Sequence, residues 1–484
     1  MSPLSPFRPF KLTFTITFTN TITTIFTTTM TTTLKPNTDA VIGVIFLGRK
    51  RPGFDPEWGA AMENRVRAFL AAENLATVTP AEKVTDEPTL RAALKLFAER
   101  GVNALAILQT TQGDGRLSQT VAQTWPDPVI LWATPEKPTG DMISSCSLVA
   151  THNWATHFRM LGRRAEIVYG APEDAAVKRQ FTEAVNIVLT ARRLRSTRLA
   201  LVGSHAPGFL AMANDTFHTL RDIGAQTQTY SLVEFTDIAR AIPDDAIADD
   251  VARFKQLGIP HKDTTDDDLP TASRLYLAMR HFFDNEKIDA LALREWPEMP
   301  NIFGQWPYVG MTRLLDEGRV VACEGDADGA LAMFIGQQLG FGPSYITDWL
   351  EHDDKTITAW HIGAMPTKLS PPPGQPGGPR LAIHYNIKKP LCVESTLTPG
   401  MPVTMARFWR CDGKWLATAR EGVTLKPRHH FMMSNGLVEL TRENPRAWFD
   451  TIVNEGMPHH PIVFRGHHEE MLKRFARVMK MQFI

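Results

Sequence analysis

Two groups of acidic residues follow predicted buried strands, at the position where a ligand site is most often built. The first group lies in residues 293–298 (Leu-Arg-Glu-Trp-Pro-Glu), where Glu295 and Glu298 follow the apolar run Ala290–Leu293. Open α/β sheets bind ligands outside the carboxyl ends of their strands, so both carboxylates are well placed to act on a ligand. A solvated loop with two acidic side chains is the simpler interpretation of the same residues.

The second group lies in residues 322–329 (Ala-Cys-Glu-Gly-Asp-Ala-Asp-Gly), which follow another short apolar strand. It contains Glu324, Asp326 and Asp328. An apolar helix is expected over residues 331–339, and Asp is a common helix cap, so capping explains one of the three carboxylates. Capping does not explain all three, and we therefore expect this turn to be functional.

Histidines gather near the C-terminus, in residues 457–468 (MPHHPIVFRGHH). Neighbouring side chains of an extended segment point to opposite faces, so at most one of His459 and His460 is expected to face a given site. One His and two carboxylates are ligands that suit Mn²⁺, Mg²⁺ or Co²⁺, whereas a thiolate zinc site would need Cys ligands. A His-rich surface is the alternative interpretation.

The elements that must position these residues alternate between strands and helices over the first 350 residues. Strands are expected at 40–47, 76–78, 104–108, 129–133, 198–202, 288–293 and 320–323, and helices at 57–73 and 89–100. This alternation predicts two doubly wound, Rossmann-like α/β domains, at 39–195 and 196–350. The loop after residues 198–202 (GSHAPGF) lacks the GxGxxG spacing, so no dinucleotide cofactor is expected there. A helix face is expected over Leu210, Ala213, Phe217 and Leu220.

The last part of the chain follows a different pattern. Residues 370–380 are rich in Pro and Gly and fit neither a helix nor a central strand. Segments with period-two alternation surround them, at 356–361, 381–386, 402–409 and 415–420. They predict a C-terminal, mostly antiparallel, barrel-like β domain over 351–484, which ends with helices at 444–453 and 467–478.

Composition excludes several classes of protein. The 484 residues carry 52 Lys+Arg and 52 Asp+Glu, and this balance provides no electrostatic footprint for nucleic acid or anionic lipid. No stretch approaches the roughly 18 consecutive apolar residues of a membrane span. The cysteines form no CxxC pair, which argues against a disulfide framework or zinc-thiolate site and favours a cytoplasmic protein. They are Cys146, Cys323, Cys392 and Cys411.

The first 38 residues stand apart from the rest. They are rich in Thr alternating with Phe and Ile, and they have neither the basic amphipathic pattern of a transit peptide nor an uninterrupted apolar core of a signal peptide. We interpret them as a disordered or misannotated leader, with Met30 as the real start of the protein.

At its acidic groups and its His cluster, the sequence resembles the L-fucose isomerase/L-arabinose isomerase superfamily, in particular the fucose-isomerase-like branch. The resemblance covers roughly residues 197–484, and more loosely the part from Ala40 onward. The matching pieces are Trp296-Pro297-Glu298, the acidic turn 323–326 with the helix that continues to residue 337, and His460 with Gly466.

The resemblance implies a metal-dependent aldose–ketose isomerase that acts on a sugar or sugar derivative. It implies that Glu298, Asp326 and His460 bind the metal, Mn²⁺ in the first place, and that Glu298 and Asp326 are also catalytic. One carboxylate would move the proton between C2 and C1 and the other the hydroxyl proton, through an ene-diol. A metal-dependent lyase or epimerase acting on a sugar acid, and a non-catalytic sugar-binding protein, remain the alternatives.

The residues expected to bind the substrate lie in several parts of the chain. His361 belongs to a stretch, 360–366, that resembles a substrate-binding element of the superfamily, and Glu295 replaces the Cys expected in this branch. Gln112 lies in a polar loop after the strand at 104–108, and the resemblance implies that this loop reaches the site of a neighbouring subunit in a homotrimer or homohexamer. An ordinary surface turn is the alternative for that loop. The expected substrate-binding residues are His361, Glu295, Trp296, Gln112 and His459.

Overall fold

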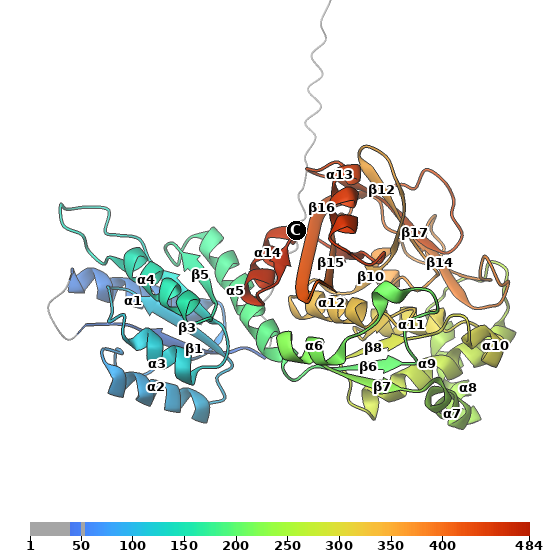
Figure 1. Ribbon diagram of the computed structural model, residues 1–484, viewed down its shortest axis with the longest axis horizontal. Helices are drawn as coiled ribbons and strands as arrows, with labels where there is room; N and C mark the ends of the chain where they lie inside the picture. The colour runs from blue at the N-terminus through green and yellow to red at the C-terminus, as the bar shows by residue number, and fades with distance from the viewer. Residues whose placement is uncertain (1–38, 50–53) are drawn as a thin grey trace, which may run out of the picture. The chain divides into compact units, whose positions relative to one another are not determined.

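The computed structural model describes residues 39–49 and 54–484. The expected leader, residues 1–38, lies outside the described residues. The described chain is mixed α/β, with two parallel sheets and a larger sheet that is mainly antiparallel (Figure 1). The domain boundaries predicted at residues 195 and 350 stay predictions.

The first parallel sheet has the strand order β2-β1-β3-β4-β5, a common doubly wound order. Its inner strands alternate apolar side chains between two buried clusters, one against helices α1 and α5 and the other against α2, α3 and α4. The sequence did not predict β5, because it is an edge strand with alternate residues exposed, and its apolar run is short and preceded by Glu166. The elements are β1 (Val41–Phe46), α1 (Pro56–Ala72), β2 (Ala76–Val78), α2 (Glu87–Glu99), β3 (Ala104–Gln109), α3 (Leu117–Thr124), β4 (Val129–Ala133), α4 (Ser147–Met160), β5 (Ala165–Tyr169) and α5 (Ala175–Leu194).

The second parallel sheet has the order β7-β6-β8-β9. Helices α7, α9 and α11 pack on one face, and α12 packs on the other with the end of α5. The elements are β6 (Arg198–Val202), η1 (Leu210–Met212), α6 (Thr216–Asp222), β7 (Gln226–Tyr230), α7 (Leu232–Ala241), α8 (Asp244–Lys255), η2 (Asp266–Asp268), α9 (Leu269–Asp284), β8 (Ala290–Leu293), α10 (Met299–Phe303), α11 (Tyr308–Asp316), β9 (Val320–Ala322) and α12 (Ala327–Gln338).

The helix face expected over Leu210–Leu220 is wrong. A short 3₁₀ turn, η1, is separated from α6 by Asp215, whose side chain accepts a hydrogen bond from the backbone N–H of His218 and so starts a new helix. Leu210 and Phe217 are exposed.

The third sheet follows the path β10-β18-β15-β16-β17-β12-β11. β10 and β11 are consecutive parts of one segment, and they pair with β18 and β12 at the two ends of the path, so the strands close on themselves as in a barrel. The strand expected over 381–386 ends at Ala382. The elements are β10 (Ser344–Ile346), β11 (Asp348–His352), β12 (Thr356–His361), η3 (Thr367–Leu369), β13 (Arg380–Ala382), β14 (Cys392–Thr396), β15 (Pro402–Cys411), β16 (Lys414–Leu425), β17 (Ser434–Leu440), α13 (Pro445–Asn454), β18 (Ile462–Arg465), α14 (Glu469–Val478) and β19 (Gln482–Phe483).

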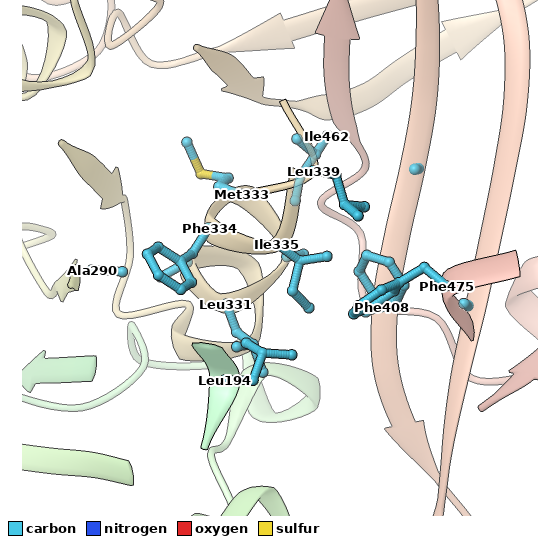
Figure 2. Packing of buried hydrophobic residues seen from close by; sticks show 14 of the residues in the cluster. Leu194, Ala290, Leu331, Met333, Phe334, Ile335, Leu339, Phe408, Ile462 and Phe475 are labelled. Atoms are coloured by element: carbon cyan, nitrogen blue, oxygen red, sulfur yellow. The ribbon is translucent and has the colours of Figure 1, made fainter. Parts of the chain in front are cut away.

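Helix α12 is buried between the second parallel sheet and the antiparallel sheet. Its residues from Ala327 to Gly336 are all buried, as expected for a helix that is apolar on every side. Figure 2 shows Phe334 on the side of Ala290 in β8, and Ile335 on the side of Phe408 in β15. Helix α12 lies so close to β18 that a Cβ at Gly336 would be 2.1 Å from a ring carbon of Phe464. This packing holds the N-terminus of α12, where Asp326 is the cap, between the two sheets.

Candidate functional site

The loops after β6, β8 and β9 meet at the carboxyl edge of the second parallel sheet. The backbone N–H of Glu324 donates to Oε2 of Glu295 at 2.7 Å. The carbonyl of Glu324 in turn accepts from the N–H of Ala206, at 2.8 Å, in the loop after β6. Because β8 and β9 are parallel neighbours, the two residues that follow them lie side by side, which explains the meeting of Glu295 and Glu324.

Three buried side chains direct unpaired polar atoms towards one another. Oε2 of Glu324 lies 3.2 Å from Nε2 of His460, and the rings of His460 and His361 have centroids 5.0 Å apart. Neither of those two atoms, nor either ring nitrogen of His361, makes a hydrogen bond to any described residue. One ligand atom from each of these residues lies within 4.8 Å of the others. A carboxylate and two imidazoles in this arrangement fit a divalent cation.

Asp326 is fully engaged by other groups. Its two carboxylate oxygens accept from the two Nη atoms of Arg407, both at 2.8 Å, and both side chains are completely buried. Oδ1 also accepts the N–H of Gly329 as the cap of α12, and Oδ2 lies 2.9 Å from Nδ1 of His460. Burial alone would raise the pKa of Asp326, but Arg407 and His460 hold it well below its ordinary value.

Asp326 therefore orients His460. A hydrogen bond from Nδ1 to the carboxylate assigns the hydrogen to Nδ1 and leaves Nε2 facing Glu324. Burial disfavours the charged imidazole, but the neighbouring carboxylates of Asp326 and Glu324 outweigh burial and raise the pKa of His460 to about 10. His361, which lacks such partners, has its pKa lowered well below the ordinary value by burial and by the charge of His460.

Glu295 is a buried carboxyl group beside this cluster. Burial, and then the negative charge of Glu324, raise its pKa to about 8. The hydroxyl of Tyr308 donates to Oε1 of Glu295 at 3.4 Å, and Tyr308 is itself wholly buried. The raised pKa favours the protonated form of Glu295, which suits a group that takes part in proton transfer.

Asp348 forms a second group with the paired histidines. Its Oδ1 lies 3.6 Å from Nε2 of His460 and 3.8 Å from Nε2 of His459. The expectation that only one of the two histidines faces a given site is wrong, because the chain bends at His459 instead of continuing as a strand. Burial raises the pKa of Asp348 to about 6, and burial lowers that of His459 to about 4.

The structure does not bring the other sequence-predicted residues into this cluster. Glu298, in the turn before α10, pairs with Arg294, whose Nε donates to Oε2 at 3.1 Å. Trp296 packs against the core that underlies the sheet. Gln112 lies just past β3 of the first sheet, where its backbone N–H donates to the carbonyl of Ser145 at 2.8 Å.

Three contributors were not selected from the sequence. Glu324 was noted within the acidic turn, and its place two residues after the end of β9 is the signal that singles it out. Arg407 is a charged residue in a strand whose neighbours are buried and apolar, which is itself a sign of a buried partner. Asp348 offers no comparable signal, because it begins a short strand with no buried residue.

The chain is similar to several curated isomerases. It is 25% identical over 449 residues to a sulfoquinovose isomerase of Alkalicoccus urumqiensis, covering 91% of this chain and 98% of the relative. A sulfoquinovose isomerase of Priestia aryabhattai is 22% identical over 444 residues, with the same coverage, and one of Clostridium sp. (strain MSTE9) is 25% identical over 389 residues, covering 78% of this chain and 86% of the relative. These relatives point to an aldose–ketose isomerase, the class of enzyme predicted from the sequence.

Other comparisons add little. No family model matches the chain. A periplasmic solute-binding protein of an ABC transporter from Actinobacillus succinogenes 130z, solved with bound D-allose, is 9% identical and covers 62% of this chain and 91% of its own, with a TM-score of 0.17. That score is too low to support an inference about fold or function.

Within the described ranges, 39–49 and 54–484, no helix is both long and apolar enough to cross a membrane.

Proposed function

We propose that this chain converts an aldose into the corresponding ketose and that its substrate is sulfoquinovose or a closely related sulfonated sugar. The observation that carries the proposal is the buried group of Glu324, His361 and His460, whose unpaired polar atoms face one another beside Glu295. The names of the relatives support the choice of substrate.

The residues fit a divalent cation, and we assign Glu324, His361 and His460 as its ligands, with Mn²⁺ the first candidate. This set keeps His460 from the sequence prediction and replaces Glu298 and Asp326, whose oxygens are taken up by Arg294 and Arg407. When bound, the ion would stabilise the negative charge that develops on adjacent sugar oxygens. Asp326 and Arg407 are positioning residues in this proposal, because they act through His460.

Two carboxyl groups next to the ligand set are available for proton transfer. Glu295 lies on one side, held by the N–H of Glu324 and the hydroxyl of Tyr308, and Asp348 lies by the two histidines. An aldose–ketose isomerisation needs one group to move the proton between C2 and C1 and another to serve the sugar hydroxyls. We assign these two tasks to Asp348 and Glu295, with an ene-diol between substrate and product.

The test is product analysis. Purified protein, stripped of metal and then supplied with Mn²⁺, is incubated with sulfoquinovose in D₂O, and the sugars are followed by NMR. We expect the ketose to form only with the metal and to carry solvent deuterium at C1. Absence of any ketose from sulfoquinovose and from a panel of other aldoses would overturn the proposed function. Equal turnover without metal would overturn the metal assignment alone.

A further inference from the structure

Arg294 lies beside the site and takes no part in the proposed isomerisation. It follows β8 directly and precedes Glu295. Its Nη1 donates to Oγ of Ser204 at 3.1 Å, while Nε and Nη2 both donate to the carboxylate of Glu298. Glu298 thus holds one edge of the guanidinium and leaves Nη1 directed towards the loop after β6.

The loop that Arg294 reaches is packed against the turn that carries Glu324. A Cβ at Gly325 would lie only 2.0 Å from the carbonyl oxygen of Ser204, so the two backbones are in direct contact. Two residues further on, the N–H of Ala206 donates to the carbonyl of Glu324. Arg294 therefore reaches the Glu324 turn through Ser204: its guanidinium donates to the Ser204 hydroxyl, and the Ser204 backbone contacts Gly325 in that turn.

Arg294 differs from the two other arginines near this turn in its accessibility. Arg407 is completely buried, and both of its Nη atoms are bound to Asp326. Arg410 is 13% exposed, and its Nε and Nη2 are bound to Asp328. The side chain of Arg294 is 23% exposed, and Nη1 retains an N–H beyond the one given to Ser204.

We propose that Arg294 and Ser204 bind the anionic group of the substrate, while Glu298 fixes the orientation of the guanidinium. The inference rests on the proposed function and extends it to the part of the sugar that does not react. The N–H that Nη1 retains can donate to an oxygen of a sulfonate or a phosphate, and the guanidinium adds its positive charge. The Ser204 hydroxyl donates to the carbonyl of His205 at 3.1 Å, and in this proposal it turns to donate to the bound anion instead. A neutral sugar would make weaker hydrogen bonds to these donors and would lack the attraction between opposite charges, so the pair would favour an anionic sugar.

The test compares charged and neutral sugars on the Mn²⁺-loaded protein. The values of kcat and KM are measured for sulfoquinovose, glucose 6-phosphate and the neutral 6-deoxyglucose with the unmodified chain, Arg294→Gln, Arg294→Lys and Ser204→Ala. Loss of a hydrogen bond to a charged group predicts a rise in KM for the anionic sugar of about 10- to 100-fold in Arg294→Gln. We expect a smaller rise in Arg294→Lys and in Ser204→Ala, and little change for 6-deoxyglucose.

Arg410→Gln is the control, because it also breaks an ion pair near the same turn, in this case a mostly buried one, and it should leave the preference between sugars unchanged. Circular dichroism and thermal unfolding show whether each variant is folded. The inference would be overturned if kcat/KM fell equally for charged and neutral sugars in both Arg294 variants, or if it fell in neither variant. If the unmodified chain preferred glucose 6-phosphate to sulfoquinovose, and Arg294→Gln raised the KM for glucose 6-phosphate, the anion site would be upheld and the sulfonated substrate rejected.

Discussion

Oδ2 of Asp326 lies 2.9 Å from Nδ1 of His460, and both side chains are completely buried. The two residues are 134 positions apart in the chain, and the contact joins the N-terminus of α12 to the segment before β18. Asp326 also forms a two-point ion pair with Arg407 of β15. The orientation of His460 thus depends on a carboxylate that is itself held by a third element.

The first prediction concerns this ion pair. Asp326→Asn should lower turnover and destabilise the protein by about 3–5 kcal/mol, because it leaves the buried guanidinium of Arg407 without a counter-charge. The double variant Asp326→Asn/Arg407→Met should recover much of the stability without recovering turnover. Urea unfolding and steady-state kinetics measure the two effects. Unchanged turnover in Asp326→Asn would remove Asp326 from the site.

The second prediction separates the two carboxylates of residues 293–298. Glu295→Gln keeps the size of a buried side chain and removes its acid–base function, so kcat should fall by about 10²- to 10⁴-fold. Glu298→Gln should instead act on the binding of the anionic sugar, through Arg294, and alter KM more than kcat. A large loss of kcat in Glu298→Gln with an active Glu295→Gln would restore the assignment made from the sequence.

The third prediction concerns the metal ligands. Calorimetric titration with Mn²⁺ should show one site per chain, and His361→Ala and Glu324→Gln should each weaken binding of the ion by at least 10-fold. His384→Ala is a suitable control, because His384 is also a buried histidine but packs against Trp306 outside the ligand set. Tight binding in both ligand variants would contradict the proposed set and favour Asp348 and His459.

The fourth prediction concerns pH and the loop before α4. The carboxylate of Glu136 accepts five hydrogen bonds from Ser144, Ser145 and Cys146. Burial works in the opposite direction, but these bonds lower the pKa of Glu136 from 4.5 to about 2. A lowered pKa stabilises the fold above the unfolded value, and this stabilisation is lost as the pH falls from about 4.5 towards 2.

Glu136→Gln should therefore be less stable than the unmodified chain at pH 7, with a difference that shrinks as the pH falls below 4.5. Thermal unfolding between pH 3 and pH 7 measures this difference. Glu99→Gln, at the exposed end of α2, is the control and should show little difference at any pH. A constant difference across the range would mean that the Glu136 carboxylate does not act through its charge.

The last prediction concerns Gln112, which the loop of Glu136 supports through the bond between the Gln112 N–H and the Ser145 carbonyl. If the Gln112 loop completes the site of a neighbouring subunit, light scattering should show an oligomer and Gln112→Ala should raise KM. A fully active monomer, or a variant with unaltered kcat and KM, would exclude this loop from the mechanism.

The sequence by itself determined the parallel strands and the place of the acidic residues. Apolar runs such as Ala290–Leu293 favour buried strands, and Glu295 and Glu324 follow two such runs, β8 and β9. The same reasoning located β1, β3, β4 and β6 but missed the edge strands β5 and β7. β5 has a buried Glu166 between its other residues, and β7 consists of polar residues and a Tyr, so neither contains a continuous apolar run of four residues. His460, chosen from the C-terminal His cluster, lies in the buried group, and its role as a metal ligand stays a prediction.

Only the tertiary structure decided which of the neighbouring acidic residues face the site. Glu298 and Glu295 are three positions apart, yet Glu298 pairs with Arg294, because the turn before α10 directs the two side chains to different partners. Asp326 forms an ion pair with Arg407, 81 positions away, because α12 is buried between the two sheets. Such partners are set by the packing of distant elements, and the local pattern of residue types contains no information about that packing.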